Sequence, residues 1–241
     1  MRTAPALLLL AFALPAFADT VSIPANRDNT LYENATGSVS NGAGPTMFAG
    51  RNASASNFRR RALIRFDVAG SVPAGSTLTS VTLTLNMSQA ATPGGQAIEL
   101  HRALSDWGEG TSNAGAAGGS GVASTANDAT WIHRFWSTTL WSAAGGDFAA
   151  AASASQSVGI EGPYAWSGAG LVADAQAWLD APASNFGWLL LGNETTSQSV
   201  KRFDTREAIS ESSRPSLTLE FTPPGTPAAA TSWGRIRATY R

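Results

Sequence analysis

The stretch Leu78-Thr-Ser-Val-Thr-Leu-Thr-Leu-Asn-Met87 alternates apolar and polar side chains along almost its whole length. Successive side chains of a β-strand point to opposite faces, so this pattern predicts a strand with one buried and one solvated face. The segments on either side, Val72-Pro-Ala-Gly-Ser76 and Thr92-Pro-Gly-Gly95, carry the proline and glycine residues typical of turns. The stretch therefore has the composition and the boundaries of a strand in a β protein.

The same alternation recurs along the chain, in segments separated by glycine and proline. Longer examples are residues 62–68, 98–104 and 216–221, and shorter ones are residues 21–24, 30–33, 46–49, 131–135, 157–160, 187–191 and 200–204. About ten strands with short connections predict an all-β fold, specifically a jelly-roll-like β-sandwich.

One segment departs from this period of two and predicts a single short amphipathic helix. Its apolar residues recur at helical spacing and precede Pro182: Leu171, Val172, Ala175, Trp178 and Leu179. Such a helix is expected to close one open end of the sandwich with its apolar stripe. Asp174, Gln176 and Asp180 are then expected to face solvent.

The stretch Lys201-Arg-Phe-Asp-Thr-Arg-Glu207 concentrates charges in a chain of which only 14% is charged. If Phe203 points into the core, alternation places Arg202 and Asp204 on the opposite face. Arg206 and Glu207 then fall at the end of the strand, where a guanidinium and a carboxylate can pair through two hydrogen bonds.

Residues 1–18 have the features of a secretory signal peptide: Arg2, an apolar run over residues 6–14, and Ala16-Phe-Ala18 before Asp19. The apolar run is too short to span a membrane, and no later segment has the roughly 20 apolar residues that a spanning helix needs. We therefore expect an exported protein without a transmembrane segment, located outside the cell, in the periplasm or at the cell surface. The signal and the Ala- and Arg-rich composition look bacterial.

The chain contains no cysteine, so neither disulfides nor thiolate chemistry are expected. Removal of Arg2 with the signal leaves 15 of the 16 basic residues against 17 acidic ones. Nucleic-acid binding needs a clustered basic face, so this near-neutral balance argues against it.

The remaining length fits one large β domain over residues 19–223, followed by a Pro/Ala linker and a short tail over residues 224–241. Residues 111–127 are nearly all Gly, Ala, Ser and Thr and predict a long mobile loop.

Aromatic residues are concentrated between residues 106 and 166, where the chain has Trp107, Trp131, Trp136, Trp141, Tyr164 and Trp166. An exposed indole presents an apolar plane that stacks on the C–H face of a sugar, while neighbouring polar groups hold its hydroxyls. Most large aromatic side chains fill protein cores. Trp136, Trp141 and Tyr164 lie near loop-like sequence and are the rings expected to be exposed.

The titratable residues predict no catalytic site. Asp106 and Glu109 could form the acid and base pair of a glycosidase, but nothing in the sequence fixes the distance between any two carboxylates. The two histidines, His101 and His133, have no second His or Cys at metal-ligand spacing. No cofactor is expected. A structural calcium ion is compatible with a sandwich of this kind, although no calcium-binding loop is evident.

Several motifs in order resemble those of the DNRLRE domain, over nearly all of residues 19–223. They are Arg27-Asp-Asn-Thr-Leu-Tyr-Glu33, Arg60-Arg-Ala-Leu-Ile-Arg-Phe-Asp67, Pro73-Ala-Gly-Ser-Thr-Leu-Thr-Ser80, Trp107-Gly-Glu-Gly110 and Arg202-Phe-Asp-Thr-Arg-Glu207. The resemblance implies a secreted or cell-surface β-sandwich module similar to carbohydrate-binding module family 96, and it implies no catalytic residue.

Two functions are therefore expected. The first is a secreted, non-catalytic carbohydrate-binding module that holds a polysaccharide or cell-surface glycan through Trp136, Trp141 and Tyr164. The alternative is a structural protein of the cell surface or extracellular matrix that has no soluble ligand and is attached by its C-terminal segment. The sequence does not predict an oligomeric state.

Overall fold

The structure is a computed structural model that describes residues 18–225. The predicted signal peptide up to residue 17 and the tail from residue 226 lie outside the described residues. Strands are the dominant secondary structure of the described chain, and there is one α-helix, which confirms the all-β prediction. The strands are β1 Asp19–Tyr32, β2 Val39–Ser40, β3 Thr46–Arg51, β4 Arg59–Phe66, β5 Thr77–Ala90, β6 Gln96–Arg102, β7 Val122–Ala123, β8 His133–Phe135, β9 Thr139–Leu140, β10 Ala154–Val158, β11 Gly162–Ser167, β12 Trp188–Leu191, β13 Lys201–Asp204 and β14 Ser216–Thr222. The helix is α1 Ala169–Asp180, and short 3-10 turns span Pro182–Ser184 and Glu211–Ser213.

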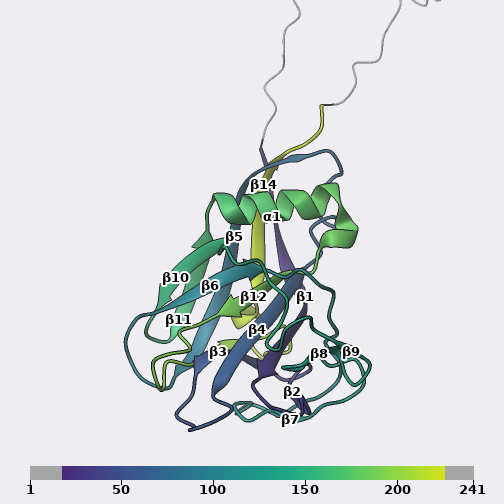
Figure 1. Ribbon diagram of the computed structural model, residues 1–241. Coiled ribbons are helices and arrows are strands. Elements are labelled where there is room, and N and C mark those ends of the chain that lie inside the picture. Colours follow the sequence, from purple (N-terminus) through teal and green to yellow (C-terminus); the bar gives the residue numbers. More distant parts are fainter. Residues whose placement is uncertain (1–17, 226–241) are drawn as a thin grey trace, which may run out of the picture.

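The main strands form two antiparallel layers that share β1 and β3, because β3 pairs with β13 of one layer and with β4 of the other (Figure 1). The first part of β1 pairs with β14, which pairs with β5, and β5 in turn pairs with β11. The second part of β1 pairs with β4, from which the other layer continues through β12 and β6 to β10. A β-bulge between Ala25 and Arg27 marks the change of layer, because a bulge bends its strand locally. Thus two strands predicted separately, over residues 21–24 and 30–33, are one bent strand.

The main core lies between the layers and beneath the helix. The alternating residues of β5 predicted to be buried, Val81, Leu83, Leu85 and Met87, all belong to it. Trp178 of α1 and Trp188 of β12 meet edge to face there, with ring centroids 4.4 Å apart. Burying aromatic side chains of this size supplies a large hydrophobic stabilisation without any disulfide.

Helix α1 lies across one end of the strands, as the sequence predicts (Figure 1). The predicted solvent exposure of Asp174 is wrong. Asp174 is buried because it accepts a hydrogen bond from the Trp188 indole Nε1 at 2.9 Å and another from the Ser153 hydroxyl. The side chain of Gln176, which was also expected to face solvent, contacts the protein: its Oε1 accepts a hydrogen bond from the Leu78 backbone N–H at 2.8 Å. Asp180 is exposed as predicted.

The glycine- and serine-rich segment over residues 111–127 is held by hydrogen bonds rather than by hydrophobic contacts. The Tyr32 hydroxyl donates to the Gly118 carbonyl at 2.6 Å, and the Ala114 N–H donates to Asn41 Oδ1 at 2.7 Å. Within this segment, β7 pairs with β2. The pattern of apolar residues could not predict these hydrogen bonds, because they involve backbone groups.

Across residues 18–225, no helix combines the length and the apolar character needed to cross a membrane.

Candidate functional site

A second hydrophobic cluster covers the outer face of β4, on the side away from the main core. Leu63 belongs to this cluster, whereas its neighbours Ala62 and Ile64 belong to the main core. The loops between β6 and β10 bring Trp107, Trp131 and Trp141 onto Leu63. Trp107 and Trp131, which were not among the rings expected to be exposed, therefore form a second core together with Trp141, which was.

The predicted exposure of Trp141 is wrong, because its side chain is only 6% exposed. The indole Nε1 donates to the Thr130 carbonyl oxygen at 2.9 Å, which satisfies its polar group inside the cluster. The ring therefore has no face available for a sugar. Its position in a loop gave no sign of burial, because the partners that cover it come from distant segments.

Tyr164 of β11 is half-buried and packs against the main core. Its hydroxyl accepts the N–H groups of Gly159 and Ile160, both at 3.1 Å, and donates to the Ile160 carbonyl at 2.7 Å. These bonds use the donor of the phenol and both of its lone pairs. Tyr164 thus closes the turn between β10 and β11 and packs against the main core, whereas Trp141 belongs to the second cluster.

Trp136 is the one tryptophan of residues 18–225 that is not buried. It follows β8, and its ring meets the His133 ring edge to face, with centroids 4.8 Å apart and an interplanar angle of 84°. Burial lowers the pKa of His133, so the imidazole is neutral at pH 7. The pair therefore presents an uncharged aromatic surface, with the His133 Nδ1 already 3.2 Å from the Thr130 hydroxyl.

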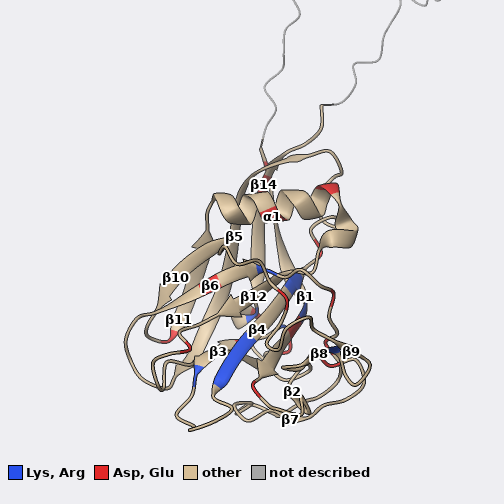
Figure 2. Ribbon diagram, viewed as in Figure 1, with Lys and Arg blue, Asp and Glu red and all other residues tan. Residues whose placement is uncertain are grey.

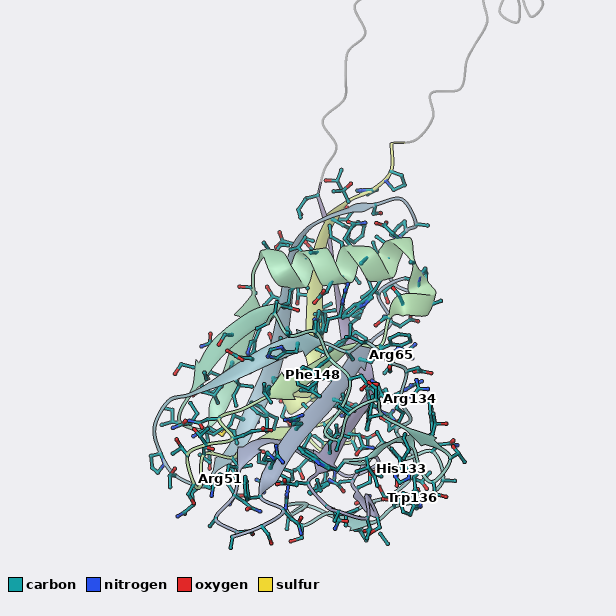
Figure 3. The ribbon with its side chains drawn as sticks, viewed as in Figure 1. Arg51, Arg65, His133, Arg134, Trp136 and Phe148 are labelled. Carbon is teal, nitrogen blue, oxygen red and sulfur yellow. The ribbon has the colours of Figure 1, made fainter. Side chains whose placement is uncertain are left out.

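Arginine residues lie next to this aromatic pair and along β4 (Figure 2). Arg134 precedes Trp136 by two positions, and its Nη1 donates to the Asp106 carbonyl oxygen at 3.3 Å. Arg27 pairs with the Asp106 carboxylate at 3.0 Å and is the cross-strand neighbour of Arg65. Figure 3 shows Arg65, Arg134, His133 and Trp136 along one side of the molecule. We call these four residues and Asp106 the Trp136 surface.

Two cations of the Trp136 surface form no direct ion pair with a carboxylate of residues 18–225. In the described part of the chain, neither Arg65 nor Arg134 has an acidic side chain at ion-pair distance. The Nε of Arg65 is buried and has no acceptor. Burial, and next the charge of Arg27, lower the pKa of its guanidinium, and the charges of Asp106 and Asp67 offset this only in part. A guanidinium binds carboxylates and sulfates through two parallel hydrogen bonds. The surface thus combines an aromatic ring with cations available to an anion.

The carboxylates considered for acid–base catalysis are already engaged. Asp106 is paired with Arg27, and both oxygens of Glu109 accept hydrogen bonds from Arg206, at 2.8 and 2.6 Å. The sequence predicted that Arg206 pairs with Glu207 through two hydrogen bonds, but the structure has only one contact, between Nε and Oε1 at 2.9 Å, and the two parallel hydrogen bonds go to Glu109. The contact of Arg206 with Glu109 was not predicted, because the two residues are far apart in the sequence. Phe203 is buried, while Arg202 and Asp204 are partly exposed, as alternation predicts.

Carboxylates that could hold a metal ion converge near Arg206. Asp28, Glu109 and Glu207 each offer one oxygen, and these oxygens lie within 4.8 Å of one another. His101 and His133 are not part of such a group within residues 18–225. The arrangement is therefore an all-oxygen cluster, and it lies where β1, the loop after β6 and the loop after β13 meet.

The loop after Trp141 is shaped by Asp147, which accepts N–H groups from Ser142 and Ala143 and a hydroxyl from Ser105. Burial by itself raises the pKa of Asp147, but the Ser142 hydroxyl and N–H and the other donors lower it overall below its usual value. The carboxylate is thus bound more strongly than the carboxylic acid. Its hydrogen bonds keep the segment over the second cluster in place.

Because its pKa is lower in the folded state, Asp147 stabilises the fold above the unfolded-state pKa of about 4, and this contribution is lost as the pH falls through the folded-state value. We expect the stability difference between the wild type and Asp147→Asn, measured by urea unfolding, to be present at about pH 7 and to shrink below about pH 4. A difference that stays constant down to about pH 2.5 would contradict this prediction.

No protein-family model matches the chain, and no curated protein matches it either. The similarity to the DNRLRE domain accordingly stays an expectation from the sequence.

Proposed function

We propose that this protein is an exported, non-catalytic carbohydrate-binding module that binds a polysaccharide at the Trp136 surface. The observation that carries the proposal is the exposure of Trp136, which contrasts with the burial of every other tryptophan in residues 18–225. A large indole left partly uncovered, with an imidazole at its edge, offers the apolar plane that sugar rings stack on.

The chemistry around Trp136 favours an acidic polysaccharide. Arg65 and Arg134 have no carboxylate partner among the described residues, so a uronate or sulfate group can bind them without displacing an ion pair. The Asp106 side chain, 47% exposed, can accept hydrogen bonds from sugar hydroxyls. An aromatic plane, a cation and an acceptor at one surface are the contacts that orient a sugar unit.

We expect Trp136→Ala to weaken binding to polygalacturonate about tenfold, because one stacked ring contributes about 1.4 kcal/mol. The melting temperature should change little, since the ring is outside both hydrophobic clusters. Affinity electrophoresis and calorimetric titration measure the binding. Ile209→Ala is the matched control, because it removes an apolar side chain that is 97% exposed elsewhere. Equal binding by the wild type and Trp136→Ala would show that the polysaccharide does not bind here.

A separate variant tests the proposed preference for an acidic polysaccharide. Arg134→Gln should weaken binding to polygalacturonate and leave binding to uncharged hydroxyethyl cellulose unchanged. Higher salt should reduce only the binding of the acidic polymer, because exposed charges are screened.

A structural role without a soluble ligand is the second candidate, and the second hydrophobic cluster favours it. Trp107, Trp131 and Trp141 stabilise the outer layer of loops instead of presenting a row of exposed rings. The C-terminal segment expected to attach such a protein lies outside the described residues. If no polysaccharide binds while deletion of residues 232–241 releases the protein from the cell surface, this second function is supported.

A further inference from the structure

Three acidic side chains from distant parts of the sequence meet beside β1, close to the C-terminal end of β13. Asp28 comes from β1, Glu109 from the loop after β6, and Glu207 from the loop after β13. One carboxylate oxygen of each lies within 4.8 Å of the other two. Two oxygens that bind the same Ca²⁺ ion, each at about 2.4 Å, can be at most about 4.8 Å apart.

The contacts already present leave part of this cluster without partners. The guanidinium of Arg206 binds Glu109 through two hydrogen bonds, and its Nε is also 2.9 Å from Glu207 Oε1. The backbone N–H of Arg206 donates to Asp28 Oδ2 at 2.9 Å, and the N–H of Asp28 donates to Glu109 Oε1 at 2.8 Å. Asp28 Oδ1 and Glu207 Oε2 are both buried and have no hydrogen-bond donor.

The burial of Asp28 makes its unpartnered oxygen significant. The side chain is 0% exposed, so water does not solvate it. A buried carboxylate without enough donors is strongly unfavourable unless a cation or a proton neutralises it.

The balance of charge at this place matches a divalent cation. Three carboxylates and the one guanidinium of Arg206 leave two net negative charges. The neighbouring Arg27 is already paired with Asp106 and does not reduce this excess. All ligand atoms are oxygens, a set that suits Ca²⁺ or Mg²⁺ and not Zn²⁺, which prefers nitrogen and sulfur.

We propose that Asp28, Glu109 and Glu207 bind a Ca²⁺ ion. Ca²⁺ is favoured over Mg²⁺ because Mg²⁺ requires a near-ideal octahedron at shorter distances and loses its water reluctantly. The three carboxylates supply part of the six to eight oxygens that Ca²⁺ takes, and water completes the set. Bound there, the ion joins β1, the loop after β6 and the loop after β13. In a chain without cysteine, this link fixes segments that a disulfide could otherwise join.

The test uses the full mature chain, treated with a chelator and dialysed. We expect Ca²⁺ to bind saturably in calorimetric titration, and at a concentration one hundred times the dissociation constant to raise the melting temperature by about 5–10 °C. Mg²⁺ at the same concentration should give less than half of this shift. The absence of both heat and shift at about 5 mM Ca²⁺ would overturn the proposal and leave a proton as the neutralising species on Asp28.

Matched variants locate the ion. Glu207→Gln keeps the size of a partly exposed side chain and should weaken Ca²⁺ binding at least tenfold, and Asp28→Asn should do the same at the buried position. Glu220→Gln is the control, because Glu220 is an exposed carboxylate of β14 outside the cluster. If Glu207→Gln binds Ca²⁺ as the wild type does, the ion lies elsewhere and the assignment is wrong. If Asp28→Asn does not fold, Glu207→Gln alone decides. Neither outcome depends on polysaccharide binding.

Discussion

Replacing Trp141 with alanine is expected to lower the free energy of unfolding by about 3–5 kcal/mol, which is the usual loss when a buried tryptophan is truncated. The side chain is 6% exposed and packs in the second cluster with Trp107 and Trp131. The substitution leaves a cavity and also leaves the Thr130 carbonyl without the indole donor. Urea unfolding followed by tryptophan fluorescence measures the loss.

Trp136→Ala is the matched control for this prediction. It removes the same side chain five positions earlier, from a ring that is partly exposed. Its cost should be below about 1 kcal/mol, as is usual for surface positions. If the two variants lose similar amounts of free energy of unfolding, the burial of Trp141 in the second cluster does not contribute the stability predicted here. Weakened polysaccharide binding by a folded Trp141→Ala protein, together with normal binding by Trp136→Ala, would move the binding surface to Trp141.

Replacing Arg61 with alanine is expected to lower the free energy of unfolding by about 2–4 kcal/mol. The Arg61 guanidinium binds both oxygens of Glu194, at 2.7 and 3.0 Å, and donates to the Gly145 carbonyl at 2.8 Å. It also lies over the rings of Trp131 and Phe148, 4.9 and 5.3 Å from their centroids. Both members of the ion pair are largely buried, so removing Arg61 leaves Glu194 in a poorly solvated place without an ion-pair partner among residues 18–225.

Two comparisons separate these contributions of Arg61. Arg61→Lys keeps the charge without the two parallel hydrogen bonds and should recover only part of the stability. The double variant Arg61→Ala with Glu194→Ala should be less destabilised than the sum of the two single variants, because the unpaired charge is absent. Glu211→Ala, which breaks the exposed pair with Arg214 at 3.7 Å, should cost almost nothing. An Arg61→Ala loss as small as that of Glu211→Ala would refute the prediction.

Strand and helix positions were largely predictable, because local patterns carry them. The four long alternating segments correspond to β4, β5, β6 and β14, and the helical spacing corresponds to α1. The prediction was incomplete where the alternation of apolar and polar residues is interrupted inside a longer strand. Pro24 and the bulge after Ala25 interrupt the alternation of β1, although the backbone continues as one strand. Strand β11 was missed because Gly-Pro-Tyr-Ala-Trp-Ser over residues 162–167 lacks clear alternation.

Lys201 and Asp174 show why burial of charged residues could not be predicted. Alternation places Lys201 on the same face as Phe203, and the Lys201 side chain is in fact 0% exposed. Its ammonium donates to the carbonyl oxygens of Thr92, Gly94 and Gly159, at 3.1, 3.1 and 3.3 Å. Burial lowers the pKa of Lys201. These carbonyl acceptors, like the indole that donates to Asp174, come from distant segments. The residues next to Lys201 and Asp174 in the sequence therefore do not reveal them.

The sequence by itself determined the class of fold, the positions of most strands and the single helix, because these follow from the period of the hydrophobic pattern over a few residues. The choice of which aromatic rings are exposed was decided by the tertiary structure, since burial depends on the loops that fold over Leu63. Trp136 and Trp141 occupy similar sequence contexts, yet Trp141 is buried in the second cluster and Trp136 is only partly buried. The meeting of Asp28, Glu109 and Glu207 was likewise decided in three dimensions, because strand pairing between distant segments brings their charges together.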